Sequence, residues 1–363
     1  MSPSTPIFVL GYMHSGTTLL QNILAANPDV YSCGGETKFF DYLPMIRKEY
    51  PSLEYEIDRR KFINFIGKTI HYGYWLPYQK VIAAHKFQRI QDLDEDEISQ
   101  ILGEISGQTD YGVIFRSIFD YFARQAGKSH WLEKTPTHVY HVDNIIKSIP
   151  DARFVIIVRD PRDILASKKT RTLSVWTTNR YTDKQKPIKA LEILYNPVWD
   201  TLAWQAAARS SANSYDRYTS QMYMLKYEDL VQTPDIQIRK LCEFLNLTYY
   251  ESMVDVPSGI PAEWKSNNRD ERGIKSEYVG RWKNVLDNPE LATCQFLVKH
   301  EMKFLDYKLH PIHWIYNLTI PFIIVNALFE LIYRLYTRLR LGGFNYLLLV
   351  LQNYIKRLVK IFN

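Results

Sequence analysis

A loop bounded by two glycines, Gly11 and Gly16, constrains the fold of this chain more than any other feature of its sequence. It follows the apolar run 7–10, which predicts a buried strand, and it precedes the segment 17–26, which has the pattern of a helix. A strand, a tight turn and a helix in this order are typical of a parallel α/β sheet. In such a unit the N–H groups of the turn and of the helix N-terminus form a site for an anion.

A second segment of the same kind begins at the β-branched run Ala152–Val158, which predicts a strand buried on both faces. Asp160 is expected to cap a helix that starts at Pro161 and runs through Ser167. The chain is therefore predicted to form a parallel α/β fold. Further elements are expected at these positions: a strand over Met222–Tyr227 and helices over Arg59–Ile70, Glu95–Ile105, Val113–Arg124, Val139–Ser148, Val198–Tyr218 and Pro234–Leu245, the last of them capped by Thr233.

The spacing Gly-x4-Gly is that of a P-loop, but the loop lacks the lysine that nucleoside triphosphatases place after the second glycine. Thr17 occupies that position. The substitution disfavours a P-loop kinase or nucleoside triphosphatase and keeps an anion site for a shorter phosphate chain. A tight turn without a ligand is the alternative.

Arg159 and Ser167 indicate a second anion site. Arg159 ends the second strand, and Ser167 lies about two helical turns further on. Ligands of parallel sheets gather at the carboxyl ends of strands, and the arginine fork matches phosphate oxygens. The alternative, equally compatible with the spacing, is an ion pair between Arg159 and Asp160 or Asp163 at the start of the helix.

The other reactive side chains suggest neither a metal site nor a disulfide framework. The cysteines at 33, 242 and 294 are far apart and odd in number, which favours a reducing compartment. The acidic run 92–97 is more typical of a helix N-terminus than of a metal cluster. His138 and His141 are spaced i, i+3 and are expected to pack or to lie on the surface. The basic segment Lys168–Lys189 predicts either a solvated loop or a mobile cover over an anionic site.

Together these segments resemble the sulfotransferases that use 3′-phosphoadenosine 5′-phosphosulfate (PAPS). Any one motif is weak, whereas several in the expected order over about residues 6–305 are specific. The resemblance is to the branch that contains bacterial sulfotransferases and tyrosylprotein sulfotransferases. It is carried by the segments Ser15-Gly16-Thr17-Thr18, Gly34-Gly35-Glu36-Thr37-Lys38, Leu132-Glu133-Lys134-Thr135-Pro136, Val158-Arg159-Asp160 through Ser167, Lys226-Tyr227-Glu228-Asp229-Leu230 and Val279-Gly280-Arg281-Trp282-Lys283-Asn284.

The resemblance implies a three-layer, P-loop-like fold and a set of roles that suit the chemistry of the residues. Glu36 would be the general base for an acceptor hydroxyl, and Lys134 would stabilise the negative charge that develops during transfer. The donor would be held by Ser15, Gly16, Thr17 and Thr18 at its 5′-phosphosulfate, by Arg159 and Ser167 at its 3′-phosphate, and by Tyr227 and Arg281. No metal is expected. An alternative for Glu36 is to cap a helix beginning at Thr37.

Position 14 departs from the family pattern, which has Arg or Lys there. His14 is cationic only below about pH 6.5 unless its surroundings raise its pKa, as a bound anion would. His14 is therefore either a donor to the phosphosulfate, with a catalytic share, or a polar loop residue without one.

The acceptor is expected to be a hydroxyl on a carbohydrate or a lipid-linked compound, with peptidyl tyrosine as the alternative. Tyrosylprotein sulfotransferases are lumenal enzymes with an N-terminal anchor and disulfides, for which this sequence shows no signal. The strand-like run 7–10 leaves no room for a leader, so we expect a cytoplasmic enzyme. The sequence leaves the oligomeric state open.

The net charge of +6 is concentrated in the tail. Residues 311–363 contain six Lys or Arg and one Glu, which leaves the first 310 residues nearly neutral and excludes a globally basic nucleic-acid binder. We therefore expect a catalytic domain over 1–310 and a hydrophobic, basic helical region over 311–363. Segment 312–333 has the length of a membrane span but contains polar residues. Helices lying in an anionic membrane surface, or packing on the core or a partner, are the two alternatives.

Overall fold

The computed structural model describes residues 4–33, 35–72, 93–105, 107–177, 195–257 and 272–362. The chain divides into two compact units. The first comprises Met1–Gly11, Gly16–Ile157 and Asn213–Ile274, and the second comprises Tyr12–Ser15, Val158–Ala212 and Lys275–Asn363.

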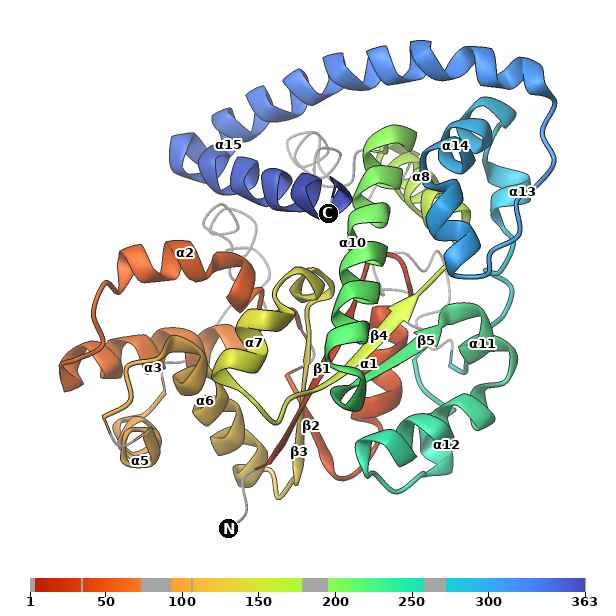
Figure 1. Ribbon diagram of the computed structural model, residues 1–363. Coiled ribbons are helices and arrows are strands. Elements are labelled where there is room, and N and C mark those ends of the chain that lie inside the picture. Colours follow the sequence, from red (N-terminus) through yellow and green to blue (C-terminus); the bar gives the residue numbers. More distant parts are fainter. Residues whose placement is uncertain are drawn as a thin grey trace. The chain divides into compact units, whose positions relative to one another are not determined.

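A five-stranded sheet in the order β2-β3-β1-β4-β5 forms the centre of the α/β fold (Figure 1). Its strands are β1 (Thr5–Gly11), β2 (Val30–Ser32), β3 (His130–Lys134), β4 (Arg153–Val158) and β5 (Met222–Lys226). The pairings β2–β3, β1–β3 and β1–β4 are parallel, and Val9 lies opposite Lys134. Because β1 lies between β3 and β4, the carboxyl ends of these three strands are neighbours at one edge of the sheet. The predicted parallel α/β architecture is confirmed.

An aromatic layer holds one face of the sheet. The ring of Phe8 in β1 stacks on Phe154 of β4 at a centroid distance of 5.6 Å and meets Trp131 of β3 edge-on at 5.4 Å. Trp131 in turn stacks on Phe119 of helix α6 at 4.5 Å. All four side chains are fully buried, so apolar burial and ring packing fix this helix against the strands.

Helices of the first unit lie around the sheet, with α3 and α5 packed on α6 (Figure 1). They are α1 (Thr17–Ala25), α2 (Phe39–Glu49), α3 (Glu56–Tyr72), α5 (Glu95–Ile105), α6 (Tyr111–Gln125), α7 (Val142–Ser148), α11 (Tyr227–Gln232) and α12 (Pro234–Leu245), with the 3-10 helices η1 (Pro136–Tyr140), η2 (Thr219–Gln221) and η3 (Glu251–Met253). The acidic run does begin a helix, since Asp94 and Glu97 cap the N-terminus of α5 reciprocally.

Two local predictions in the first unit are wrong. The segment 139–148 is not one helix, because His141 has non-helical backbone angles (φ −122°, ψ 11°) and separates η1 from α7. Thr233 precedes α12 as expected, but its hydroxyl donates to the carbonyl of Asp229 and does not cap the helix. The hydroxyl therefore binds a carbonyl of the preceding helix α11, and it does not accept a hydrogen bond from an N–H of α12. Ser and Thr side chains often make such local hydrogen bonds to the backbone.

The second unit is helical. It contains α8 (Pro161–Thr177), most of α10 (Pro197–Arg217), α13 (Trp282–Val285), α14 (Asn288–Phe304), η5 (Trp314–Thr319) and α15 (Ile320–Phe362). Ala166, Trp282 and Leu291 join α8, α13 and α14 in one apolar cluster. The loop prediction for Lys168–Lys189 is wrong as far as Thr177, where the chain is still helical, and residues 178–194 lie outside the described part of the chain.

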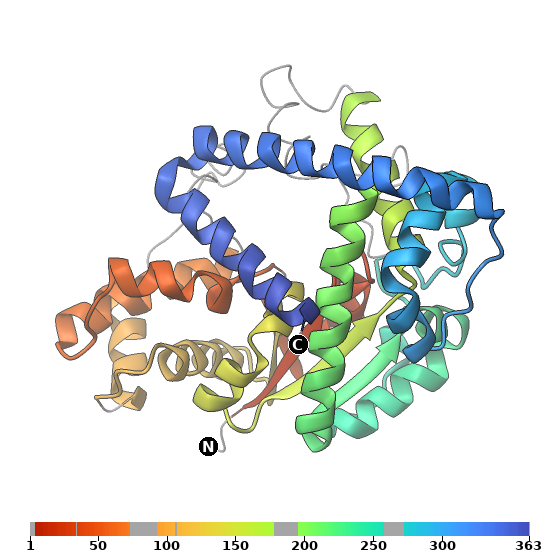
Figure 2. The same ribbon diagram turned by 45° about the horizontal axis from the view of Figure 1, so that its top comes forward.

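The last helix bends in its middle. Gly343 has φ 71° and ψ −175°, a conformation that favours glycine, and Figure 2 shows α15 turning back on itself within residues 320–362. The tail is thus helical on both sides of this bend, as its sequence predicts.

Candidate active site

The loop after β1 ends in an open helix N-terminus. Gly16 is the N-cap of α1 with φ 95°, and none of the described side chains caps this helix. The N–H groups of Thr17 and Thr18 therefore begin the helix without a side-chain acceptor, as an anion site requires. A Cβ atom at position 16 would lie 2.5 Å from Cδ2 of Tyr227, so the ring of Tyr227 packs directly on the glycine. Both the backbone angle and this contact require glycine here.

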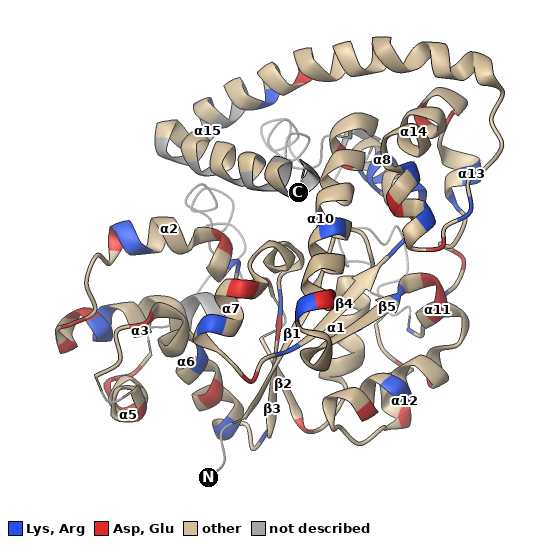
Figure 3. Ribbon diagram, in the orientation of Figure 1, with Lys and Arg blue, Asp and Glu red and all other residues tan. Residues whose placement is uncertain are grey.

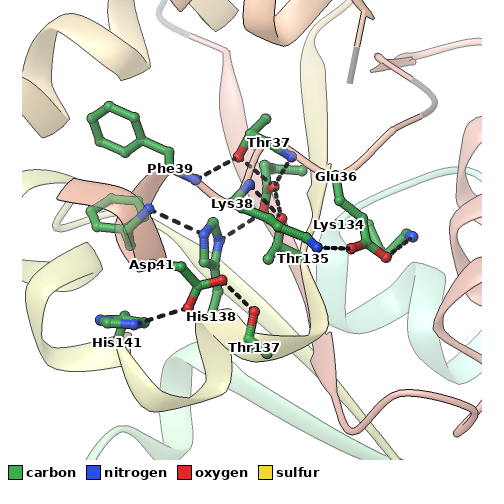
Figure 4. A network of polar contacts seen from close by, with 12 residues as sticks. Glu36, Thr37, Lys38, Phe39, Asp41, Lys134, Thr135, Thr137, His138 and His141 are labelled. Carbon is green, nitrogen blue, oxygen red and sulfur yellow. Dashed lines mark hydrogen bonds and ion pairs between the residues drawn. The ribbon is translucent and has the colours of Figure 1, made fainter. Parts of the chain in front are cut away.

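Glu36 and Lys134 meet at the end of β3. The Nζ atom of Lys134, the last residue of this strand, lies 2.9 Å from Oε1 of Glu36, and Nζ of Lys38 lies 3.7 Å from Oε2 (Figure 4). Burial raises the pKa of Glu36, but the charges of Lys134 and Lys38 outweigh it and hold that pKa below its usual value. Glu36 is thus a carboxylate at neutral pH. Helix α2 begins only at Phe39 and has no side-chain cap, so Glu36 does not cap it.

A buried carboxylate, Glu133, fastens the chain next to Glu36. Its Oε1 atom accepts hydrogen bonds from the hydroxyl of Thr37 at 2.8 Å and from the hydroxyl of Thr135 at 2.6 Å. The hydroxyl of Thr135 accepts from the backbone N–H of Lys38 at 3.1 Å. Both residues that flank Glu36 on its C-terminal side are therefore tied to the end of β3, which carries Lys134 (Figure 4).

His138 completes this network from η1. Its Nδ1 atom lies 3.0 Å from Oε2 of Glu133, and its Nε2 atom accepts the N–H of Phe40 at 3.2 Å. The Nε2 atom of His141 lies 3.1 Å from Oδ1 of Asp41, and the hydroxyl of Thr137 donates a hydrogen bond to Asp41. Both histidines are buried, which confirms the predicted packing role.

Sequence reasoning missed the carboxylate partners of the two histidines because Asp41 precedes them by about a hundred positions. Glu133 belongs to the motif segment that contains Lys134, but its side chain alternates with that of Lys134 along a strand and was assigned no role of its own. The parallel sheet brings the segment around Glu36 to the end of β3, and this juxtaposition could not be read from local patterns. Among the described residues no cluster of side chains has the composition of a metal site.

In the second unit Arg159 connects three segments. Its Nη1 atom donates to the carbonyl of His14 at 3.0 Å, and its Nη2 atom donates to the carbonyl of Tyr278 at 2.7 Å. The Nδ1 atom of His14 lies 3.1 Å from the hydroxyl of Ser167. The residues predicted for the two ends of the donor, His14 and the pair Arg159 and Ser167, are therefore in contact with each other.

Asp163 fixes the segment that carries Arg281. Its carboxylate accepts the N–H of Gly280 at 2.8 Å and the N–H of Trp282 at 3.0 Å. Asp160 binds Arg162 through paired hydrogen bonds of 2.6 Å and 3.0 Å. Sequence reasoning considered Asp163 only as an ion-pair partner of Arg159. Its observed role is to hold the backbone on both sides of Arg281.

His14 is surrounded by cations. Burial, together with the charges of Arg171, Lys168 and Arg159, holds the pKa of His14 well below its usual value. The imidazole is therefore neutral at pH 7, and a bound anion is needed to protonate it. Ser15, next to it, is buried with a hydroxyl that has no hydrogen-bond partner among the described residues. A buried hydroxyl and a cluster of cations fit an anionic ligand.

An α/β fold with a P-loop-like turn, a carboxylate paired with a buried lysine and a cationic cluster is typical of proteins that bind anionic groups. The Sulfotransferase family model matches residues 6–251, and the chain belongs to this family. The resemblance found in the sequence is thus confirmed at the level of the family.

Individual relatives are distant. The chain is 22% identical over 271 residues to the omega-hydroxy-beta-dihydromenaquinone-9 sulfotransferase Stf3 of Mycobacterium bovis, with 68% of this chain and 64% of that protein covered. It is 24% identical over 264 residues to a protein-tyrosine sulfotransferase of Caenorhabditis briggsae, with 73% of each covered. A similar solved structure is the sulfotransferase domain of the Synechococcus PCC 7002 olefin synthase, at 17% identity and a TM-score of 0.48, covering 85% of this chain and 97% of that one.

Proposed function

We propose that this chain transfers the sulfuryl group of PAPS to a hydroxyl acceptor by in-line displacement, with Glu36 as the general base. The observation that carries the proposal is the pairing of Glu36 with the buried Lys134 at the end of β3, in a chain of the sulfotransferase family. A carboxylate at this position can take the proton of an attacking hydroxyl, and a fixed cation beside it can stabilise the charge that develops in transfer.

The donor would contact two groups of residues. Ser15, Gly16, Thr17 and Thr18 would hold the 5′-phosphosulfate by N–H groups and hydroxyls, with Tyr227 packed on Gly16. Arg159 and Ser167 would hold the 3′-phosphate. His14 would be a further donor to the 5′-phosphosulfate, and Arg281 would be a further donor on the phosphate side of the nucleotide. The acceptor oxygen would form its bond to sulfur as the bond from sulfur to the bridging phosphate oxygen breaks. Adenosine 3′,5′-bisphosphate would leave, and Glu36 would hold the proton of the acceptor. These residues supply all the charge stabilisation in this proposal, and no metal has a role in it.

We further propose a carbohydrate or lipid-linked hydroxyl as the acceptor. A lipid acceptor is supported by the similarity to Stf3, whose name refers to a hydroxylated menaquinone, and by the apolar, basic tail. Peptidyl tyrosine is the second candidate because protein-tyrosine sulfotransferases are also similar to this chain. In this proposal the catalytic domain 1–310 works in the cytoplasm and 311–363 brings it to the inner face of a membrane.

Glu36→Gln tests the proposed base, because it keeps the shape of the side chain and removes its basicity. With 35S-labelled PAPS and a panel of sugar, lipid and tyrosine-peptide acceptors, we expect transfer to fall by at least about a thousandfold. Calorimetry should find binding of adenosine 3′,5′-bisphosphate within a factor of two of the wild type. Unchanged transfer by the variant would rule out Glu36 as the base. Labelled product from the tyrosine peptide alone would favour the second acceptor.

A further inference from the structure

Helix α15 has its polar and apolar faces reversed over residues 320–336. Glu330 and Arg334 are the only charged residues of this stretch, and Figure 3 shows most of it in tan. Both side chains lie toward the protein, because Glu330 binds Asn196 and Arg334 is buried. A helix on the surface of a soluble protein has the opposite arrangement, with its apolar stripe inward and its charges toward water. By length and composition, Trp314–Tyr336 could cross a membrane.

The inner face of this stretch binds the start of α10. The side-chain amide of Asn196 donates to Oε2 of Glu330, and Nε1 of Trp199 donates to the carbonyl of Ala327 at 2.7 Å. Arg334 lies one turn after Glu330 and donates to Oε1 of that carboxylate at 2.8 Å. Ala327 is fully buried and Arg334 is 8% exposed. The two charged groups of this stretch are thus satisfied within the second unit.

The outer face consists of large apolar side chains. Phe322 is 77% exposed, Phe329 67% and Ile332 66%. Val325, Leu328, Tyr333 and Tyr336 are also exposed. Single exposed apolar residues are ordinary, but a continuous row over four helical turns, interrupted only by Asn326, marks a surface that contacts something other than water.

We infer that the outer face of residues 322–336 docks on an anionic lipid bilayer, with the helix lying along the membrane surface and not crossing it. The contacts of Glu330 with Asn196 and of Ala327 with Trp199 hold the middle of this stretch against the start of α10, so its outer face is the one that can enter lipid. A crossing helix would have to place Glu330 and Arg334 in hydrocarbon without Asn196 and Trp199, at high cost.

The positive charge of the tail favours an anionic bilayer over a second copy of the chain as the partner of this outer face. Arg340 is exposed one turn after Tyr336, and residues 311–363 carry five of the six net positive charges. Two copies that met through this face would bring these charges together, whereas anionic headgroups attract them, at about 1 kcal/mol for each cation near the surface. Aromatic side chains such as Trp314 and Tyr336 suit the headgroup level of the interface.

The test is sedimentation of the full chain with vesicles. This docking face deepens the membrane contact proposed above, and the measurement needs neither donor nor acceptor. The test variant is Phe329→Asp with Ile332→Asp, and the matched control is Phe296→Asp with Phe304→Asp. Phe296 and Phe304 lie on α14 in the same unit and are each 64% exposed, so both pairs add two charges at exposed apolar positions.

With vesicles of phosphatidylcholine and phosphatidylglycerol at 7:3, we expect the wild type and the control to bind, and the test variant to bind at least tenfold more weakly. Pure phosphatidylcholine vesicles should bind the wild type more weakly than the anionic ones. Equal binding of the test variant and the control would overturn the docking face. If the wild-type protein stays with the vesicles during alkaline carbonate extraction, the helix crosses the membrane and the inference is wrong. If the wild type forms a dimer that the test variant loses, and the wild type does not bind vesicles, the face binds a second copy of the chain instead. In all these cases transfer activity can persist, so the failure of this inference is distinct from failure of the transferase proposal.

Discussion

The Nζ atom of Lys134 lies 2.9 Å from Oε1 of Glu36, so the proposed base is ion-paired with the proposed stabilising cation. An ion-paired carboxylate is a weak base, because the cation lowers its pKa. In the proposed mechanism Lys134 would turn to the charge on the transferring group, so Glu36 would lose its nearest cation and its pKa would rise. The base would then gain strength only once the donor is in place, which limits proton removal in its absence.

Removing Lys134 should raise the pKa of Glu36. Lys134→Met deletes the larger of the two lysine charges that lower this pKa and leaves the burial that raises it. In the wild type the low pKa keeps Glu36 ionised throughout the assayable range, so kcat/KM should have no acid limb from Glu36 above about pH 5. In the variant an acid limb should move into the range of pH 5–7, together with an overall loss of rate. The measurement is kcat/KM against pH from 5 to 8.

Lys38→Met is the matched control for this prediction. Lys38 lies further from Glu36, at 3.7 Å, and its charge is the second contribution to the low pKa. In Lys38→Met the acid limb of kcat/KM should move to higher pH by a smaller amount than in Lys134→Met. The rate of Lys38→Met at pH 8 should stay closer to that of the wild type. If the pH profile of kcat/KM for Lys134→Met has no acid limb between about pH 5 and 7, Lys134 does not control the pKa of Glu36.

The sequence was sufficient for the parts of the fold that depend on local signals. The glycine-bounded loop, the β-branched run before Arg159 and the acidic start of α5 each fix an element through nearby residues, and all three lie where predicted. The α/β class followed from the order of these elements. The break at His141 was missed because it depends on the contact of that ring with Asp41, a residue one hundred positions earlier.

The candidate site shows the same division. Motif residues such as Glu36 and Lys134 could be named from the family resemblance. The structure adds that their side chains form an ion pair. Glu133 was named only as part of a motif segment and His138 only as a packing or surface residue. Their role in holding the segment after Glu36 became visible only when the sheet brought two distant segments together. The reversed polarity of α15 was likewise hidden, because a list of apolar and basic residues does not say which face binds the protein.

Thr37→Val should show whether the hydroxyl of Thr37 positions Glu36 for catalysis in addition to stabilising the fold. The change preserves the shape of the side chain and removes the hydroxyl that donates to Glu133 at 2.8 Å, one residue after Glu36. We expect a loss of about 1 kcal/mol in stability and about a tenfold fall in kcat with KM little changed, because small displacements of a reacting group are costly. Thr137→Val removes a hydroxyl that binds Asp41 and serves as the control. It should cost similar stability with kcat within a factor of two, and equal kcat losses would contradict the positioning role.

Acid should destabilise the first unit through Asp41 and Glu133. Burial raises the pKa of each carboxyl, but the contacts with His141 and His138 outweigh it and hold both pKa values below their usual range. A carboxyl with a lowered pKa contributes stability that is complete above its unfolded pKa of about 4 and is lost as the pH falls through the folded pKa. The thermal midpoint should therefore drop steeply below pH 4. Asp41→Asn should be less stable at pH 7 and show a shallower drop. An equally steep drop in this variant would assign the acid sensitivity to other groups.

Binding of adenosine 3′,5′-bisphosphate should take up a proton at His14. Burial and the charges of Arg171, Lys168 and Arg159 hold the pKa of His14 low, so the free protein carries a neutral imidazole at pH 7. A phosphate beside the ring supplies the opposite charge and raises this pKa, so affinity should gain about threefold to tenfold from His14 as the pH falls from 8 to 6. Calorimetry in two buffers of different ionisation enthalpy measures the uptake directly. His14→Ala controls for the titration of the phosphate itself and should lack this uptake, whereas His14→Arg should bind tightly at pH 8 without it. Equal proton uptake by the wild type and His14→Ala would show that His14 stays neutral and acts, at most, through its contact with Ser167.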